Sequence, residues 1–193
     1  MMQIIKKSSS GIQSIPLNSV MLSMRKIFLL GEITMNSASE IIQQLLFLEN
    51  EDNTAPISII IDSPGGEVNA GLMIYDQLKG MKDIPIKMYC TGIAASMAAI
   101  LLAGGQKGNR FILPHSKVMI HEPLIANGVG GSATSIQRTA ESIMETKRIT
   151  TELLARDTGK TVEEIGKAIS YDNFMNAEEA VSFGICDKII CRV

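Results

Sequence analysis

The stretch Ile57-Ser-Ile-Ile-Ile-Asp-Ser-Pro-Gly-Gly66 joins a β-branched run to a tight turn, and apolar residues then follow at helical spacing over Val68–Lys79. Short β-branched runs that end at Pro and Gly are typical of buried strands, so the segment predicts a strand, a turn and a helix. The same order returns at Pro85–Cys90, which leads through Thr91–Ser96 into a helix of small residues that ends at Gly104. Repeated strand–helix units predict an α/β fold with mostly parallel strands and right-handed crossovers.

Further elements are predicted on both sides of these units. Strand patterns occur at Lys26–Leu30, Val118–Ile120 and Ile189–Ile190, and capping boxes that predict helix starts occur at Ser37/Glu40, Thr161/Glu164 and Asn176/Glu179. A long helical pattern ends at Gly159, and the glycine-rich stretch before it indicates that the chain leaves the core over about 124–159. Residues 1–24 are polar and weakly patterned. We therefore expect a flexible N-terminal arm (1–24) and one domain (25–193).

Composition excludes several classes of function. The 193 residues are 46% hydrophobic and 20% charged, with a formal net charge of −2, which is ordinary for a folded globular protein and unlike a nucleic-acid binder. The three cysteines have no CxxC spacing, so we expect neither a disulfide framework nor a zinc site, and a reduced, cytoplasmic setting. No apolar run reaches the length of a membrane span. We expect no membrane or nucleic-acid partner, no metal and no cofactor.

Ser96 is the first candidate for chemistry. It follows a strand and precedes the helical run Met97–Leu102, so its hydroxyl is expected at a helix N-terminus, where the free Met97 N–H can point at a developing oxyanion. The turn Ser63-Pro-Gly-Gly66 can bring a second N–H, that of Gly66, close to a ligand because glycine has no Cβ. Each segment also has a plain structural explanation: Ser96 can be a simple helix cap, and Ser63–Gly66 can be a structural turn.

Two histidines occur, His115 and His121, and they limit the choice of a general base. His121 ends an apolar strand beside a glycine-rich segment, whereas His115 follows Pro114 in a predicted surface loop. Asp172 can orient an imidazole and stabilise its charged form. A structural histidine and a simple turn aspartate remain open as alternatives.

Four blocks occur in one order: Asp62-Ser-Pro-Gly-Gly66, Gly92-Ile-Ala-Ala-Ser-Met-Ala98, Val118-Met-Ile-His-Glu-Pro123 and Asp172-Asn-Phe-Met-Asn-Ala177. Together they resemble the signature blocks of the Clp protease proteolytic subunit, a serine peptidase family, and the similarity runs from about Ile27 to Ile189. The resemblance implies a crotonase-like α/β fold whose long helix protrudes as a handle.

The resemblance also implies residue roles. Ser96 would be the nucleophile, His121 the general base and acid, and Asp172 the residue that holds the imidazole, while Gly66 and Met97 match the oxyanion-hole positions. A substrate peptide can add as a strand between the backbone near Gly66–Ala70 and that at 124–131. We expect substrate contacts at the following residues: Gly65, Glu67, Val68, Leu124 and Ile125.

The implied partners are polypeptide substrates, an AAA+ Clp unfoldase ATPase, and further copies of the chain in heptameric rings stacked in pairs around a chamber. A paralogous subunit is a further candidate, because Ser170-Tyr171 stands where many members carry an Asp-Arg pair that links rings. Three alternatives stay open: a non-catalytic or obligately mixed-ring subunit, a crotonase-type acyl-CoA enzyme, and a signal-peptide peptidase of related fold. The last normally uses a Ser-Lys pair and a membrane anchor.

Overall fold

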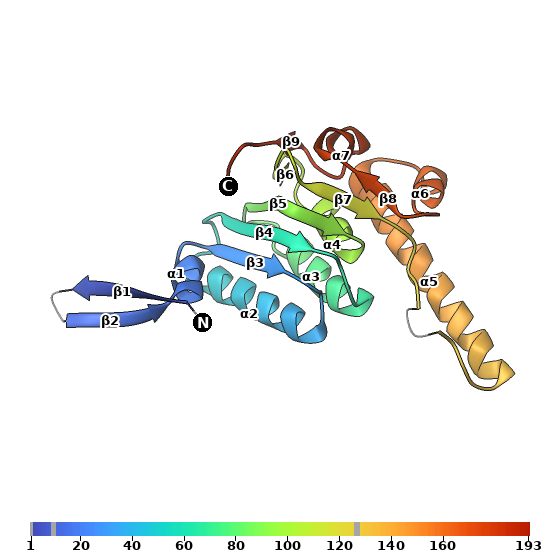
Figure 1. Cartoon of the computed structure of the whole chain (residues 1–193), viewed down its shortest axis with the longest axis horizontal. Helices are drawn as coiled ribbons and strands as arrows, with labels where there is room; N and C mark the ends of the chain where they lie inside the picture. Colours follow the sequence, from blue (N-terminus) through green and yellow to red (C-terminus); the bar gives the residue numbers. More distant parts are fainter. Residues whose placement is uncertain (1, 9–10, 126–127) are drawn as a thin grey trace.

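The computed structural model describes residues 2–8, 11–125 and 128–193 of the chain (Figure 1). Strands and helices alternate through its central part, as the strand–helix repeats predict. The strands are β1 (Gln3–Ser8), β2 (Gly11–Pro16), β3 (Lys26–Leu30), β4 (Ile57–Ser63), β5 (Ile86–Ala95), β6 (Arg110–Ile112), β7 (Lys117–Ile120), β8 (Asn173–Met175) and β9 (Lys188–Ile189). The helices are α1 (Leu17–Ser23), α2 (Met35–Glu51), α3 (Val68–Gly80), α4 (Met97–Ala103), α5 (Ala133–Thr158), α6 (Val162–Ala168) and α7 (Ala177–Phe183).

The main sheet is parallel in the order β3-β4-β5-β6-β9. It divides at β5, whose first half pairs with β6 and whose second half pairs with β7 in parallel. Strand β8 then adds to β7 in antiparallel orientation. The predicted α/β class with a mostly parallel sheet is confirmed.

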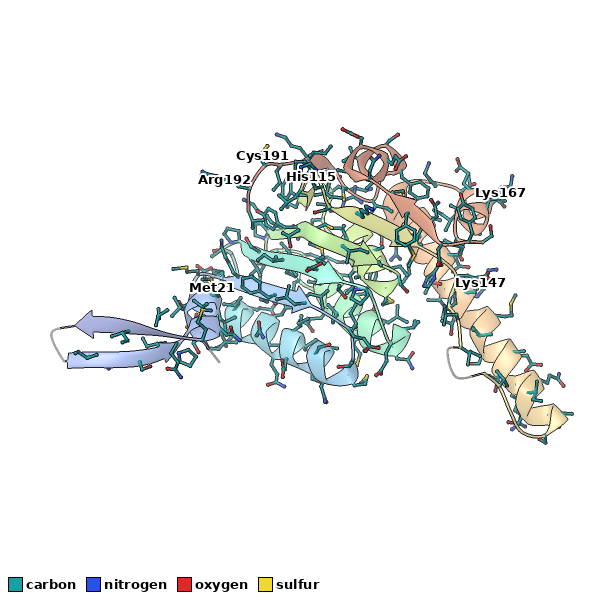
Figure 2. The ribbon with its side chains drawn as sticks, in the orientation of Figure 1. Met21, His115, Lys147, Lys167, Cys191 and Arg192 are labelled. Carbon is teal, nitrogen blue, oxygen red and sulfur yellow. The ribbon has the colours of Figure 1, made fainter. Side chains whose placement is uncertain are left out.

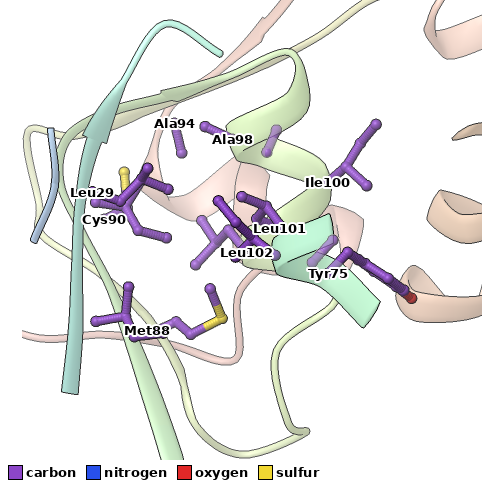
Figure 3. Close-up of a cluster of buried hydrophobic side chains, with 14 of the residues drawn as sticks. Leu29, Tyr75, Met88, Cys90, Ala94, Ala98, Ile100, Leu101 and Leu102 are labelled. Atoms are coloured by element: carbon purple, nitrogen blue, oxygen red, sulfur yellow. The ribbon is translucent and has the colours of Figure 1, made fainter. Parts of the chain in front are cut away.

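Helices α2, α3 and α4 lie on one face of the sheet (Figure 1). All residues of α4 are buried, and Leu101 and Leu102 point toward Leu29, Met88 and Cys90 of the strands (Figure 3). A helix that is apolar all round is covered on every side. Because α4 is held in this way, the residue that precedes it has a fixed position.

Helix α5 forms the predicted handle and extends away from the sheet (Figure 1). Its 26 residues begin after the Ser132 cap and end at Gly159, which has φ 81°. The buried residues of the helix all lie in its last third, from Thr150 to Asp157, and its first turns are exposed. The handle is therefore attached to the core at its C-terminal end.

Several sequence expectations need correction or extension. The capping boxes Thr161/Glu164 and Asn176/Glu179 are confirmed, but α2 begins one turn earlier than Ser37/Glu40 predicts, because Thr34 is the N-cap and Ser37 is its reciprocal partner. The N-terminal segment contains an antiparallel β1–β2 hairpin and α1, none of which the sequence pattern predicted. Within the described residues, no helix has the length and apolar character needed to cross a bilayer.

Candidate active site

Ser96 connects β5 to α4 with φ 54° and ψ −122°, a conformation that residues with a Cβ rarely adopt. Its N–H donates to the Met119 carbonyl of β7 at 2.8 Å, which ties this strained junction to the neighbouring strand. The Ser96 side chain makes no capping hydrogen bond to α4. The alternative that Ser96 is a plain helix cap is therefore wrong, and its hydroxyl is free for another partner.

An irregularity in β5 brings Ser96 beside β7. Between Ile61 and Ser63 of β4 the register with β5 shifts, and the extra β5 residues are held by the Asp62 carboxylate, which accepts from the Ile93 N–H at 3.0 Å. Gly92 makes this approach possible, because a Cβ there would lie 2.4 Å from Asp62 Oδ1. The bulge redirects β5 from β6 to β7.

His121 and Asp172 are brought together by the β7–β8 pairing. Ile120, the last residue of β7, is registered with Asn173, the first residue of β8. Continuing this antiparallel order by one residue brings His121 opposite Asp172. His121 Nδ1 lies 3.0 Å from Asp172 Oδ1, and Nε2 lies 2.9 Å from Ser96 Oγ. With Nδ1–H donated to the carboxylate, Nε2 accepts from the serine hydroxyl. The three predicted triad residues thus form one continuous hydrogen-bonded chain.

Strand β8 was not predicted from the sequence. Its pairing with β7 places Asp172 next to His121. The His121 side chain is 17% exposed, whereas that of Asp172 is 66% exposed, so the carboxylate faces solvent on one side. The backbone is fixed further by the Glu122 N–H, which donates to the Ile169 carbonyl at 2.8 Å. His115, the other histidine, is exposed in the loop before β7, as expected (Figure 2).

Gly65 and Gly66 form a backbone shelf beside Ser96. Both have positive φ, 93° and 150°, and a Cβ on Gly65 would lie 2.7 Å from Ser96 Cβ and 3.0 Å from Met97 N. The Gly65 carbonyl accepts from the Ile33 N–H at 2.8 Å. In a trans peptide the next N–H points the opposite way, so the Gly66 N–H is directed away from Ile33. Met97 is the first residue of α4, where an N–H has no partner within the helix.

A groove of about 800 Å³ runs between the start of α3, the segment after His121 and the handle. Four of the five predicted substrate-binding residues line it together: Glu67, Val68, Leu124 and Ile125. Gly65 lies instead against the backbone of Ala95–Met97. Ser96 and His121 do not line the groove themselves, but Glu67 directly follows Gly66 and Pro123 lies two residues after His121, so the groove adjoins the site along the chain.

One contact near the site had no signal in the sequence. Lys147 of α5 donates to the Glu122 carboxylate, which joins the handle to the residue after His121. Twenty-five positions separate the two residues, so no local pattern could reveal the pair. Cys90 lies on β5 ahead of the serine, and burial raises the pKa of its thiol to about 11. It is therefore unsuited to act as a nucleophile at neutral pH.

The comparison with known families agrees with this geometry. A family model described as Clp protease matches residues 9–193, which is nearly the whole chain. The observed parallel sheet, the covering helices and the protruding α5 are consistent with the crotonase-like fold of that family. The chain belongs to the Clp protease family, as the four sequence blocks predicted.

Proposed function

We propose that this chain is a serine endopeptidase, the proteolytic subunit of an ATP-dependent Clp-type protease. The observation that carries the proposal is the chain of hydrogen bonds from Ser96 Oγ to His121 Nε2 and from His121 Nδ1 to Asp172. A nucleophile, a base and a group that orients the base are the three roles that acyl transfer needs, and here each has its partner within hydrogen-bond distance.

In the proposed first half-reaction, Ser96 Oγ attacks the carbonyl carbon of the scissile peptide bond while His121 Nε2 takes the hydroxyl proton. The carbonyl oxygen becomes an oxyanion that the N–H groups of Gly66 and Met97 stabilise. The tetrahedral intermediate then collapses: the C–N bond breaks, and His121 gives its proton to the leaving amine. The amino-terminal part of the substrate remains as an ester on Ser96.

The second half-reaction releases the ester. A water molecule gives a proton to His121 and attacks the ester carbonyl, and collapse of the new intermediate returns the proton to Ser96 Oγ. Asp172 stabilises the imidazolium that forms twice in the cycle and keeps Nε2 directed at the serine. The net reaction consumes one water and one peptide bond.

The proposed substrates are unfolded polypeptides. A peptide in the 800 Å³ groove can pair its backbone with the segments that carry Val68 and Leu124, as an added strand. Backbone pairing reads no side chains, so it gives broad selectivity. Substrate choice would then depend on which chains gain access to the site.

The proposed partners are a Clp unfoldase ATPase and further copies of this chain in stacked heptameric rings, in the cytoplasm, with a paralogous subunit as a further candidate. Exposed apolar surface supports association. Phe28 and Leu30 of β3 are 42% and 57% exposed, and with Leu22 of α1 they line a second groove of about 520 Å³. Large exposed apolar patches mark interaction surfaces.

The test is cleavage of a short fluorogenic peptide, measured together with the oligomeric state. We expect Ser96→Ala to lower kcat by roughly 10⁴-fold or more. The double variant His121→Ala/Asp172→Ala should have a kcat little lower than that of the less active single variant, because a triad acts as a unit. Activity that survives Ser96→Ala would refute the proposal. A wild-type chain that cleaves nothing alone, but changes the activity of a paralogous subunit, would instead support a regulatory role.

A further inference from the structure

The wall that α5 contributes to the 800 Å³ groove consists of hydroxyl, apolar and cationic side chains. One face of α5, with neighbours spaced three and four residues apart, lines it with Thr134, Ser135, Arg138, Thr139, Ser142, Ile143 and Thr146. The hydroxyls of Thr139 and Thr146 donate at 3.0 Å to carbonyls one turn earlier in the helix. These two hydroxyls are therefore used within the helix, and apart from Arg138 the residues of this wall carry no charge.

Arg138 is the exception on this wall. The other cations in the same helix have carboxylate partners: Lys147 pairs with Glu122, Arg148 with Glu145 and Glu152, and Arg156 with Asp157. Arg138 is exposed and lines the groove, and it forms no ion pair with any carboxylate in the described part of the chain. Its five N–H donors are thus available to a ligand in the groove.

The opposite wall carries the opposite charge. Glu67, beside the Gly65–Gly66 shelf, is the acidic residue among those that line the groove. It forms no ion pair with Arg138 within the described structure, so the two charges stay on separate walls. Successive side chains of an extended peptide point to opposite sides. A bound peptide would therefore present alternate residues to a cationic wall and to an acidic one.

We propose that Arg138 determines specificity, by selecting substrates with an aspartate or glutamate at the position that faces the handle. The inference deepens the proposed peptidase function and rests on it. Arg138 precedes Lys147, which pairs with the residue after His121, by nine residues, and these span about 14 Å along α5. For a peptide that runs along the handle at about 3.3 Å per residue, we expect the acidic side chain roughly four residues from the scissile bond.

The test measures binding, so that it does not depend on activity. A neutral fluorescent peptide is compared with two series in which one glutamate or one lysine is moved through each position, using the assembled Ser96→Ala protein and fluorescence anisotropy. We expect glutamate at one position to tighten binding roughly two- to fivefold at low salt, as for an exposed ion pair, and lysine there to weaken it. The preference should fade at high ionic strength.

Three further variants assign the effect to Arg138. Arg138→Gln should remove the preference, Arg138→Glu should reverse it toward lysine, and Arg138→Lys should keep most of it. Arg148→Gln is the matched control, because it removes the same charge from the same helix outside the groove.

Two results would overturn the inference: a glutamate series with no preferred position, or equal losses in Arg138→Gln and Arg148→Gln. Failure of the proposed peptidase function would be seen in a different assay, as peptide cleavage that persists in Ser96→Ala. That result would leave the binding comparison valid.

Discussion

Arg110 gives the sharpest prediction about stability, because its guanidinium is 2% exposed and joins elements that are distant in the chain. It donates to both oxygens of the Asp187 carboxylate, from Nε at 3.0 Å and from Nη2 at 2.5 Å. Its Nη1 donates to the carbonyls of Ala103, Asp157 and Gly184 at 2.8–3.1 Å. These carbonyls end α4, lie near the end of α5 and end α7, so one side chain holds three helix ends together.

We therefore expect Arg110→Met to lower the free energy of unfolding strongly. Methionine keeps the apolar volume but removes the guanidinium, so the Asp187 carboxylate keeps only the backbone N–H groups of residues 108 and 110 as donors. The carbonyls of Ala103 and Gly184 lose their bond to Arg110, while that of Asp157 keeps its bond from Lys107. Breaking a buried ion pair costs about 3–5 kcal/mol, and about 3 kcal/mol is expected here because the Asp187 side chain keeps some contact with solvent. For a chain of this length that loss lowers Tm by about 6–12 °C.

Equilibrium urea unfolding at fixed protein concentration is the assay, followed by circular dichroism. Arg148→Met is the control, since Arg148 also has two carboxylate partners but its side chain is 54% exposed. Solvent screens the ion pairs of Arg148, so Arg148→Met should lower the free energy of unfolding much less than Arg110→Met does. If both variants lose the same stability, the burial argument for Arg110 is refuted.

Three other predictions concern the site and its pH dependence. Gly65→Ala should lower kcat/KM roughly 100-fold with the fold retained, because a Cβ there would lie 2.7 Å from Ser96 Cβ and must displace it; equal activity of the variant would contradict the shelf geometry. Lys147→Met should lower kcat/KM about twofold at low salt and make activity less sensitive to salt, since the ion pair to Glu122 is partly exposed; an unchanged salt profile would contradict a role for that pair. Burial alone would raise the pKa of Asp187, but hydrogen bonds from its arginine partner hold the pKa below the ordinary value of 3.8. The stabilisation by the ionised Asp187 carboxylate is therefore complete above about pH 4 and is lost as pH falls through the lowered pKa. Urea unfolding midpoints that stay constant down to about pH 2 would count against this prediction.

Local periodicity was sufficient to predict the elements around the glycine pair and the start of the helix after Ser96. The β-branched run of β4 and the apolar spacing of α3 are strong signals, and the start of α4 follows from the run of small residues after Ser96. The glycine pair at 65–66 was correctly placed at the turn between them. These features depend on neighbours in the chain, so the sequence expresses them directly.

The parts that the sequence patterns missed depend on distant pairing. Strand β8 has only three residues and gains its hydrogen bonds from β7, more than fifty positions earlier, so Asp172 read alone resembles a turn residue. The start of α2 was misplaced because Ser37 can act as a cap or as the N3 partner of Thr34, and the structure uses the second role. Arg138 and Lys147 gave no local signal, since Arg138 lines a groove formed with distant segments and Lys147 pairs with Glu122, 25 positions away.

The central claim is that Ser96 is a nucleophile activated by His121. It is tested most directly by reaction of the assembled protein with a fluorophosphonate, followed by mass spectrometry of the peptides. We predict one adduct per chain, on Ser96, formed far more slowly in His121→Ala and absent from Ser96→Ala. An adduct on another residue, or equal labelling rates with and without His121, would contradict it.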